Sequence, residues 1–388
     1  MNSSERREGR YRRRKAKREQ KRLAILETYN FERVINPENL YKAMKESRCG
    51  VFWKASVQRY NMNFLRNILR AARDLKAGND VRKGFIEFHL TERGKVRYIR
   101  SVHFSERVVQ KSLCNNALIP HLIRSLIYDN GASIQAKGIH FAINRTKTHL
   151  RRHFKEHGLK GYILTLDFVN YFGNIQHEPL RQIFAKAFGE DERLLDLAMK
   201  FVYAFGDNGL GLGSETSQIA AVVYASKIDH YVKEVLRCKN YARYMDDSYF
   251  ICDSKEHAEQ ILSAVSIKYE EMGIITSPRK TNIVKLSRGF TFLKVQFSLL
   301  STGRVLTRPS RKGITRQRQK LNKFKKFFVE GNMRIYEIKH SYMAWRGHIS
   351  HMNARKSIHN MDSLYKRLFG MSPLKKLPKQ KQGGNTNE

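Results

Sequence analysis

The sequence predicts an α+β fold from three observations. Residues 85–101 alternate between apolar and other side chains on both sides of a glycine turn, which is typical of a β-hairpin. An apolar strand at 161–167 and a second hairpin at 241–252 carry aspartates where their strands end or turn. Helical spacing of apolar residues fills much of the remaining chain, and basic helices are expected beyond Arg304.

Composition favours a polyanionic partner. The chain has 388 residues, with 74 Lys and Arg against 35 Asp and Glu, and a formal net charge of +39. Nucleic acid is the default partner of so basic a chain, and an anionic membrane surface is the weaker alternative. No apolar run reaches the ~18 residues of a membrane span, and the polar, basic start does not resemble a signal peptide. We expect a soluble cytoplasmic protein with four reduced cysteines and no membrane partner.

The N-terminal part is basic and helical in pattern. Residues 6–22 are nearly all Arg, Lys, Glu and Gln, and two interpretations remain open: a solvated helix or disordered arm, or a phosphate-binding arm. From Val57 to Leu75 apolar residues recur at helical spacing, with a stop at Gly78. On the hairpin strand that follows, Lys95 and Arg97 share a face. They could grip a triphosphate or be ordinary exposed strand charges.

Three aspartates are candidates for metal binding. Asp167 ends an apolar strand, a position that packing explains poorly and a ligand on a rigid element explains better. Asp246 and Asp247 are adjacent at the turn of the second hairpin, where their repulsion is costly unless a cation neutralises them. A divalent metal is the simplest such cation, although a solvated turn is the alternative. Further strands are expected near Ile283 and over 290–297.

The chain resembles reverse transcriptases of the bacterial retroelement type from about Thr91 to Leu368. Any one motif is weak, but six occur in the order of the family. They are Gly94–Arg97 with Glu106, Arg107 and Gln110; Asp167–Phe172 with Ile175 and His177; Leu212–Gln218; Tyr244–Asp247; Gly273 with Lys280 and Thr281; and Phe290–Leu293.

This resemblance implies a right-hand polymerase, with fingers, a palm whose antiparallel sheet carries the Tyr-Met-Asp-Asp hairpin, and a helical thumb. The implied domains run in order along the chain. They are a basic N-terminal extension and helix at 1–84, fingers at 85–160, a palm at 161–300 with a fingers insertion at about 176–220, a thumb at 301–371 and a disordered tail at 372–388.

The resemblance also implies residue roles for RNA-directed DNA synthesis with two Mg²⁺ ions, or Mn²⁺ in their place. Asp167, Asp246 and Asp247 would hold the metals together with the backbone carbonyl of Phe168, and Lys280 would assist the departing pyrophosphate. Three groups would contact the substrates: Lys95 and Arg97 at the triphosphate with Phe172 as the steric gate; Leu212, Gly213 and Gln218 in the nucleotide motif; and Phe292, Leu293 and Lys294 as primer grip. The partners implied are template RNA, the RNA/cDNA duplex and dNTPs.

Two positions depart from the common pattern of the family. Leu212 and Gln218 stand where most reverse transcriptases carry glutamine and proline, and this resembles the enzymes of diversity-generating retroelements. Those enzymes are bacterial or phage-encoded, misincorporate opposite template adenines in mutagenic retrohoming, and imply a small basic helical accessory protein as partner. A leucine offers only van der Waals contact where glutamine can hydrogen-bond the incoming sugar, so nucleotide placement should be looser.

Two alternatives remain open at this point. A retron, group II intron-like or phage-defence reverse transcriptase would share the same palm. A non-catalytic RNA-binding protein on a polymerase scaffold is the more remote alternative, because all three acids are intact.

Overall fold

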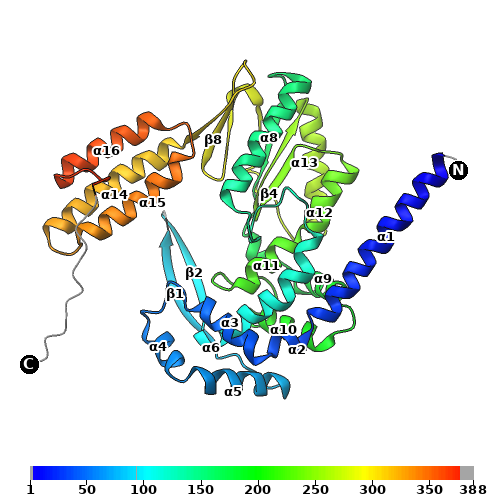
Figure 1. Cartoon of the computed structure of the whole chain (residues 1–388). Coiled ribbons are helices and arrows are strands. Elements are labelled where there is room, and N and C mark those ends of the chain that lie inside the picture. Colours follow the sequence, from blue (N-terminus) through cyan, green and yellow to red (C-terminus); the bar gives the residue numbers. More distant parts are fainter. Residues whose placement is uncertain (1–2, 93, 376–388) are drawn as a thin grey trace, which may run out of the picture. The chain divides into compact units, whose positions relative to one another are not determined.

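The computed structural model describes residues 3–92 and 94–375, and its chain divides into two compact units (Figure 1). The first unit comprises Met1–Ala142, Thr165–Phe250 and Glu259–Asn282. The second comprises Ile143–Leu164, Ile251–Ala258 and Ile283–Glu388. No described helix is both long and apolar enough to cross a bilayer.

Helices dominate the first unit. The expected helix over residues 57–75 is in fact two helices, α4 and α5, separated at Asn63. Helix α6 begins at Phe104 and continues through a π-helical turn at Cys114–Leu118. The helices of this unit are α1 (Ser3–Thr28), α2 (Phe31–Ile35), α3 (Pro37–Ser47), α4 (Ala55–Met62), α5 (Phe64–Lys76), α6 (Phe104–Leu113), α7 (Ile119–Leu122), α9 (His177–Phe188), α10 (Glu192–Tyr203), α11 (Glu215–Tyr224) and α12 (Ser226–His230). Helix α8 (Ile139–His157) and helix α13 (Lys255–Glu270) cross the division between the units.

The expected first hairpin is present. Strands β1 (Phe85–Glu92) and β2 (Lys95–Val102) pair antiparallel from Phe85 opposite Val102 to Glu92 opposite Lys95. The last pair of this register, Glu92 with Lys95, lies next to Gly94, where the sequence predicted the turn.

A four-stranded sheet carries the aspartates. Its strands are β4 (Tyr241–Tyr244), β5 (Asp247–Cys252), β3 (Tyr162–Leu166) and β6 (Asn282–Lys285), in the order β4-β5-β3-β6. Strands β4 and β5 pair antiparallel, with Tyr244 opposite Asp247. Asp167 therefore follows the last residue of β3, and Asp246 lies in the turn between β4 and β5.

The prediction of one strand over residues 290–297 is wrong. The segment forms a hairpin of β7 (Phe290–Phe292) and β8 (Val295–Leu299), and β9 (Val305–Pro309) completes a separate three-stranded sheet. Leu293 and Lys294 at the turn have φ angles of 49° and 65°. Turns of this kind usually contain Gly, Asn or Asp. Because Leu and Lys occupy these positions, the sequence did not predict the turn.

Three helices close the second unit: α14 (Arg311–Val329), α15 (Ile335–Ser350) and α16 (Arg355–Phe369). Their apolar faces meet in one core, which includes Leu321, Ile338, Tyr342, Met361 and Tyr365. These helices match the basic helices expected beyond Arg304, except that β9 precedes them. Of the tail expected from residue 372, residues 376–388 lie outside the described part of the chain.

Candidate active site

The backbone around Asp167 is fixed on both sides. Strand β3, which precedes it, is largely buried. The Asp167 carbonyl accepts a hydrogen bond from the Ser277 amide at 2.9 Å, and the Val169 amide donates to the Ile275 carbonyl at 2.9 Å. The Phe168 ring is buried, 4.5 Å from the ring of Tyr269. Asp167 is thus presented on a rigid element, as expected for a ligand.

The turn that carries Asp246 is tight and strained. Because Tyr244 pairs with Asp247, only Met245 and Asp246 lie between the strands, and Met245 has a φ of 57°. A left-handed conformation costs a residue with a Cβ about 1–2 kcal/mol, and such strain persists where surrounding contacts impose it. Both aspartates of this turn are half-buried.

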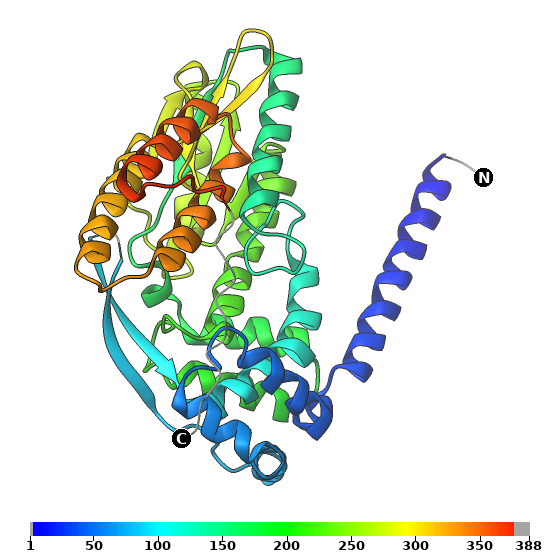
Figure 2. The same cartoon turned by 60° about the vertical axis from the view of Figure 1, so that its left-hand side comes forward.

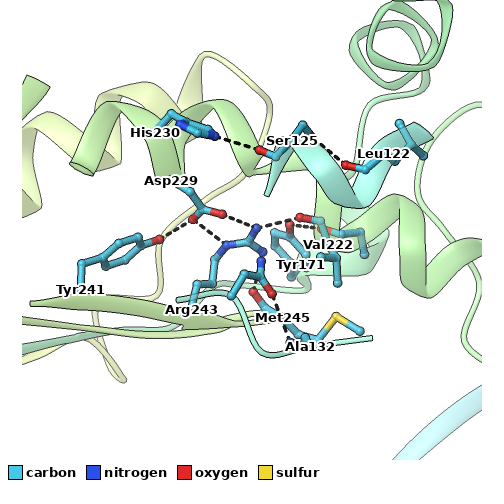
Figure 3. Close-up of polar contacts among 12 residues, drawn as sticks. Leu122, Ser125, Ala132, Tyr171, Val222, Asp229, His230, Tyr241, Arg243 and Met245 are labelled. Carbon is cyan, nitrogen blue, oxygen red and sulfur yellow. Dashed lines mark hydrogen bonds and ion pairs between the residues drawn. The ribbon is translucent and has the colours of Figure 1, made fainter. Parts of the chain in front are cut away.

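Arg243 supplies those contacts from inside the core (Figure 3). Its side chain and that of Asp229 on α12 are both 0% exposed. The guanidinium forms a bidentate pair with the Asp229 carboxylate, with Nε at 2.8 Å from Oδ1 and Nη2 at 2.7 Å from Oδ2. It also donates from Nη1 to the Met245 carbonyl at 3.1 Å and from Nη2 to the Val222 carbonyl on α11 at 2.7 Å. Tyr241 completes the cluster by donating to Asp229 at 2.6 Å.

Sequence reasoning missed this network. Its only local signal is a charged residue, Arg243, inside an otherwise buried strand, because the acid Asp229 lies on a short helix that is itself mostly polar. Buried charges are nearly always paired, but nothing in the spacing shows that these two residues pair with each other.

The three aspartates influence one another electrostatically. Burial, and then the charge of Asp167, raises the pKa of Asp246, while Lys280 and Arg97 act in the opposite direction. Burial together with the charges of Asp246 and Asp167 raises the pKa of Asp247 to about 6. Lys280 donates from Nζ to Oδ1 of Asp167 at 2.9 Å. The acids therefore crowd negative charge into a poorly solvated place, which a bound cation would relieve.

The donor set fits a hard divalent cation, because carboxylate and carbonyl oxygens are its preferred ligands. Among the described residues, however, no group of three or more His, Cys, Asp or Glu side chains is arranged to hold a metal alone. The remaining ligands would come from backbone carbonyls, such as that of Phe168, and from the substrate.

A cavity in the first unit is lined by half of the predicted site residues. Phe172, half-buried, contributes one wall, and its carbonyl accepts a hydrogen bond from the Leu210 amide at 2.8 Å. Leu212 contributes another, and its carbonyl accepts from the Arg100 amide at 3.3 Å. The predicted residues that line this cavity are Arg97, Asp167, Phe168, Phe172, Leu212, Asp246 and Lys280.

The two departures from the family pattern face different cavities. Gln218 and Gly213 line a second cavity of the same unit, together with Gln110, Lys111 and Glu215. Here Ser214 caps α11 and donates to Gln110 at 2.8 Å, and Lys111 pairs with Glu215 at 2.9 Å. Of these two residues, only Leu212 therefore lines the cavity that contains the acids.

The other predicted residues fall elsewhere. The Lys95 backbone pairs with Glu92 in the first hairpin, and its side chain lies outside the described part of the structure. Phe292 ends β7 in the second unit, and Leu293 and Lys294 form the tight turn between β7 and β8.

An α+β fold in which one carboxylate follows a strand and two more lie at a neighbouring hairpin is that of a right-hand polymerase. Residues 83–297, more than half of the chain, match the family described as reverse transcriptase (RNA-dependent DNA polymerase). The chain belongs to this family.

Similar solved structures are telomerases, and the chain spans about half of their length. Apo telomerase from Candida tropicalis truncated from its C-terminal domain shares 13% identity at a TM-score of 0.44, covering 58% of this chain and 55% of that one. Telomerase from Candida albicans in complex with a TWJ fragment of telomeric RNA shares 11% identity at a TM-score of 0.45, covering 69% and 55%. No curated protein matches.

Proposed function

We propose that this protein is an RNA-directed DNA polymerase that extends a primer on a template RNA. The observation that carries the proposal is the cavity in which Asp167, Asp246 and Lys280 meet Arg97, Phe172 and Leu212. Acids, cations and an aromatic wall are the groups needed to bind a nucleoside triphosphate and a primer end. Family membership supports the same reaction.

The reaction joins the primer 3′-oxygen to the α-phosphorus of a dNTP and releases pyrophosphate. Asp167, Asp246 and Asp247, with the Phe168 carbonyl, would hold divalent ions such as Mg²⁺, which supply Lewis-acid activation of the hydroxyl and charge neutralisation of the leaving group. Arg97 offers a guanidinium to the phosphates. Lys280, now paired with Asp167, offers an ammonium to the departing pyrophosphate.

A matched pair of aspartate variants tests this proposal. Asp246→Asn should reduce dNTP incorporation on a primed RNA template at least about 1,000-fold, because the carboxylate is lost while the shape of the side chain is kept. The control is Asp253→Asn, since Asp253 follows the same hairpin but its side chain is 56% exposed and paired with His257. Full incorporation by Asp246→Asn would refute the proposal, and full RNA binding without incorporation by the wild type would favour the non-catalytic alternative.

We further propose that copying is error-prone at template adenines, as in diversity-generating retroelements. Leu212 supports this subtype, because it lines the cavity of the acids and cannot hydrogen-bond an incoming sugar. Gln218 lines the other cavity, so we assign the looser nucleotide placement to Leu212 alone. A small basic accessory protein is the partner that this subtype implies.

Leu212→Gln is the test of the subtype. It should lower misincorporation opposite template adenine more than opposite the other bases, as measured by sequencing cDNA made from a defined RNA. Gln218→Ala, at a position that lines only the other cavity, is the control and should leave the error spectrum unchanged. An unaltered spectrum in Leu212→Gln, or accurate wild-type copying of adenine, would favour a retron or intron-like enzyme instead.

A further inference from the structure

Helix α1 is a long, charged helix with little support from its own unit. Residues 4–24 are exposed except for the half-buried Gly9. Its C-terminal end is attached by Arg124, which donates to the Lys21 carbonyl at 3.1 Å, and by His121, whose ring lies 2.6 Å from the Tyr29 carbonyl. Figure 2 shows the N-terminal part of α1, in dark blue, uncovered by other elements of the first unit.

The charges of α1 are sorted by face. Between Arg6 and Arg22 the chain has eight arginines and three lysines against two glutamates. At about 100° per residue, one face presents a stripe of Arg7, Arg10, Tyr11, Arg14, Lys15 and Arg18, which line a shallow hollow. Glu5, Glu8 and Glu19 lie off this stripe, where Glu8 pairs with Arg12 at 2.6 Å and Glu19 with Arg22 at 3.1 Å.

This arrangement opposes the stability of the helix. Arg7 and Arg10, Arg10 and Arg14, and Arg14 and Arg18 are three or four residues apart, and like charges at these spacings repel. A helix that served only to be solvated would gain from glutamates in the stripe. The stripe instead keeps its cations unneutralised by any acid within it, which suits a partner rich in negative charge.

The chemistry of the stripe favours nucleic acid over a membrane or an acidic protein. Arginine forks match phosphate oxygens in a bidentate manner, and the stripe has four arginines to one lysine. A membrane-surface helix needs a broad apolar face opposite its cations, whereas the side of α1 opposite the stripe carries Glu5, Arg13 and Gln20. Tyr11, 64% exposed within the stripe, adds a ring that can pack on sugar or base.

We propose that the stripe on α1 docks double-helical RNA, namely a folded part of the RNA that this enzyme copies. The inference rests on the proposed function, because an RNA-copying polymerase must keep hold of its template molecule outside the short copied stretch. The stripe would bind phosphates, so it needs duplex shape and charge rather than a sequence.

Two full-length variants with equal charge loss test the proposal. The stripe variant changes Arg7, Arg10, Arg14, Lys15 and Arg18 to Gln, which retains helix propensity. The control changes five other exposed cations, Arg59, Arg66, Arg70, Arg73 and Lys76 on α4 and α5, to Gln. The probe is a 20-base-pair RNA hairpin without a primer terminus.

The stripe variant should bind the hairpin at least about ten-fold more weakly than the wild type. The plot of the logarithm of its binding constant against the logarithm of the salt concentration should also be less steep. The slope should decrease in magnitude by about 0.9 for each phosphate that the stripe no longer neutralises. The control should stay within about two-fold of the wild type. Equal weakening in both variants, or none in the stripe variant, would overturn the inference. So would stripe-dependent binding of phosphatidylserine vesicles, or of a DNA duplex, without binding of the RNA hairpin.

A second measurement separates this inference from the proposed polymerase activity. Extension of oligo(dT) on poly(rA), a template without secondary structure, should proceed at the same rate in the wild type and the stripe variant. Loss of extension in both proteins would refute the polymerase proposal and remove the basis of this inference. Loss of extension in the stripe variant alone would place α1 in the catalytic apparatus and overturn its role as a separate docking surface.

Discussion

At the scale of single residues, the buried Arg243 holds the acid-bearing turn in place. Each of its three guanidinium nitrogens has a partner, and these partners come from α12, from α11 and from the turn itself. The bond to the Met245 carbonyl fixes the strained residue next to Asp246. Arg243 touches no reacting atom in this arrangement, so we regard it as a positioning residue.

Changing Arg243 should therefore alter how the acids bind metal. Arg243→Lys keeps the positive charge but replaces the planar guanidinium, with its several N–H donors, by a single ammonium group. The Met245 carbonyl therefore loses its hydrogen-bond donor. We expect incorporation to fall about 10- to 100-fold and the Mg²⁺ concentration for half-maximal activity to rise, with the KM for dNTP less affected. Arg237→Lys, on an exposed position shortly before the same strand, is the matched control.

Breaking this buried ion pair would cost about 3–5 kcal/mol, so the companion of Arg243→Lys must keep both charges. Asp229→Glu retains the carboxylate but lengthens the side chain by one methylene, and it should show the same shift in Mg²⁺ dependence to a smaller degree. An unchanged Mg²⁺ requirement in a folded variant would restrict Arg243 to a purely structural role.

Phe172 gives a second prediction at this scale. Its half-buried ring forms a wall of the cavity that contains Asp167 and Asp246. Phe172→Ala should open space for a ribose 2′-hydroxyl and raise the ratio of rNTP to dNTP incorporation about 10- to 100-fold. Tyr203→Ala, which removes an exposed ring that does not line this cavity, should leave the ratio unchanged. Continued exclusion of rNTPs by Phe172→Ala would show that the gate lies elsewhere.

At the scale of elements, the short helix α7 anchors the chain that follows α1. Its His121 ring lies 2.6 Å from the Tyr29 carbonyl and packs edge-on against Phe188, with ring centroids 5.4 Å apart. Burial lowers the pKa of His121, so the folded state favours the neutral imidazole. Stability from this group is complete above the pKa of the unfolded chain, about 6.5, and is lost as the pH falls below it.

The urea concentration at which half of the protein is unfolded should therefore decrease when the pH is lowered from 7.5 to 5.5. His121→Gln should make this decrease smaller. His153, whose pKa is also lowered mainly by burial, should account for part of the remaining slope. His359→Gln, at an exposed position on α16, is the control and should behave as the wild type. An identical pH slope in His121→Gln would mean that this imidazole is not responsible.

Local patterns predicted much of the element structure and failed where tertiary contacts decide. The strand before Asp167, the Asp246 hairpin and the helices after residue 310 follow from periodicity and turn spacing. The hairpin at Leu293 and Lys294 did not, because its left-handed turn lacks the usual glycine or asparagine. The helices α2 and α3 were missed because both are short and begin after asparagine caps within a polar segment.

In the candidate site, too, local patterns predicted some features, and tertiary contacts decide the others. The positions of the acids, after one strand and at a hairpin turn, could be predicted because periodicity and turn spacing place them there. The Arg243–Asp229 pair and the separation of Leu212 from Gln218 could not, because both depend on which faces of distant elements meet.

At the scale of the whole molecule, net charge governs binding. A chain with a formal charge of +39 should release many counterions when it binds a primed RNA template. Affinity should fall steeply between 50 and 200 mM NaCl at constant Mg²⁺, with a log–log slope of about −5 or steeper. The association rate should fall in parallel. A flat response would mean that backbone phosphates are not the main contacts.

The shared attachment of Arg243 has a consequence for how such an enzyme can evolve. One guanidinium holds both the Met245 carbonyl at the acid turn and the Val222 carbonyl of α11, the helix that follows Leu212. A mutation that shifts α11 to change base selection would pull on the turn as well. Copying accuracy and the rate of nucleotide incorporation would then vary together across descendants. Selection for a new error rate would therefore also change the rate of incorporation.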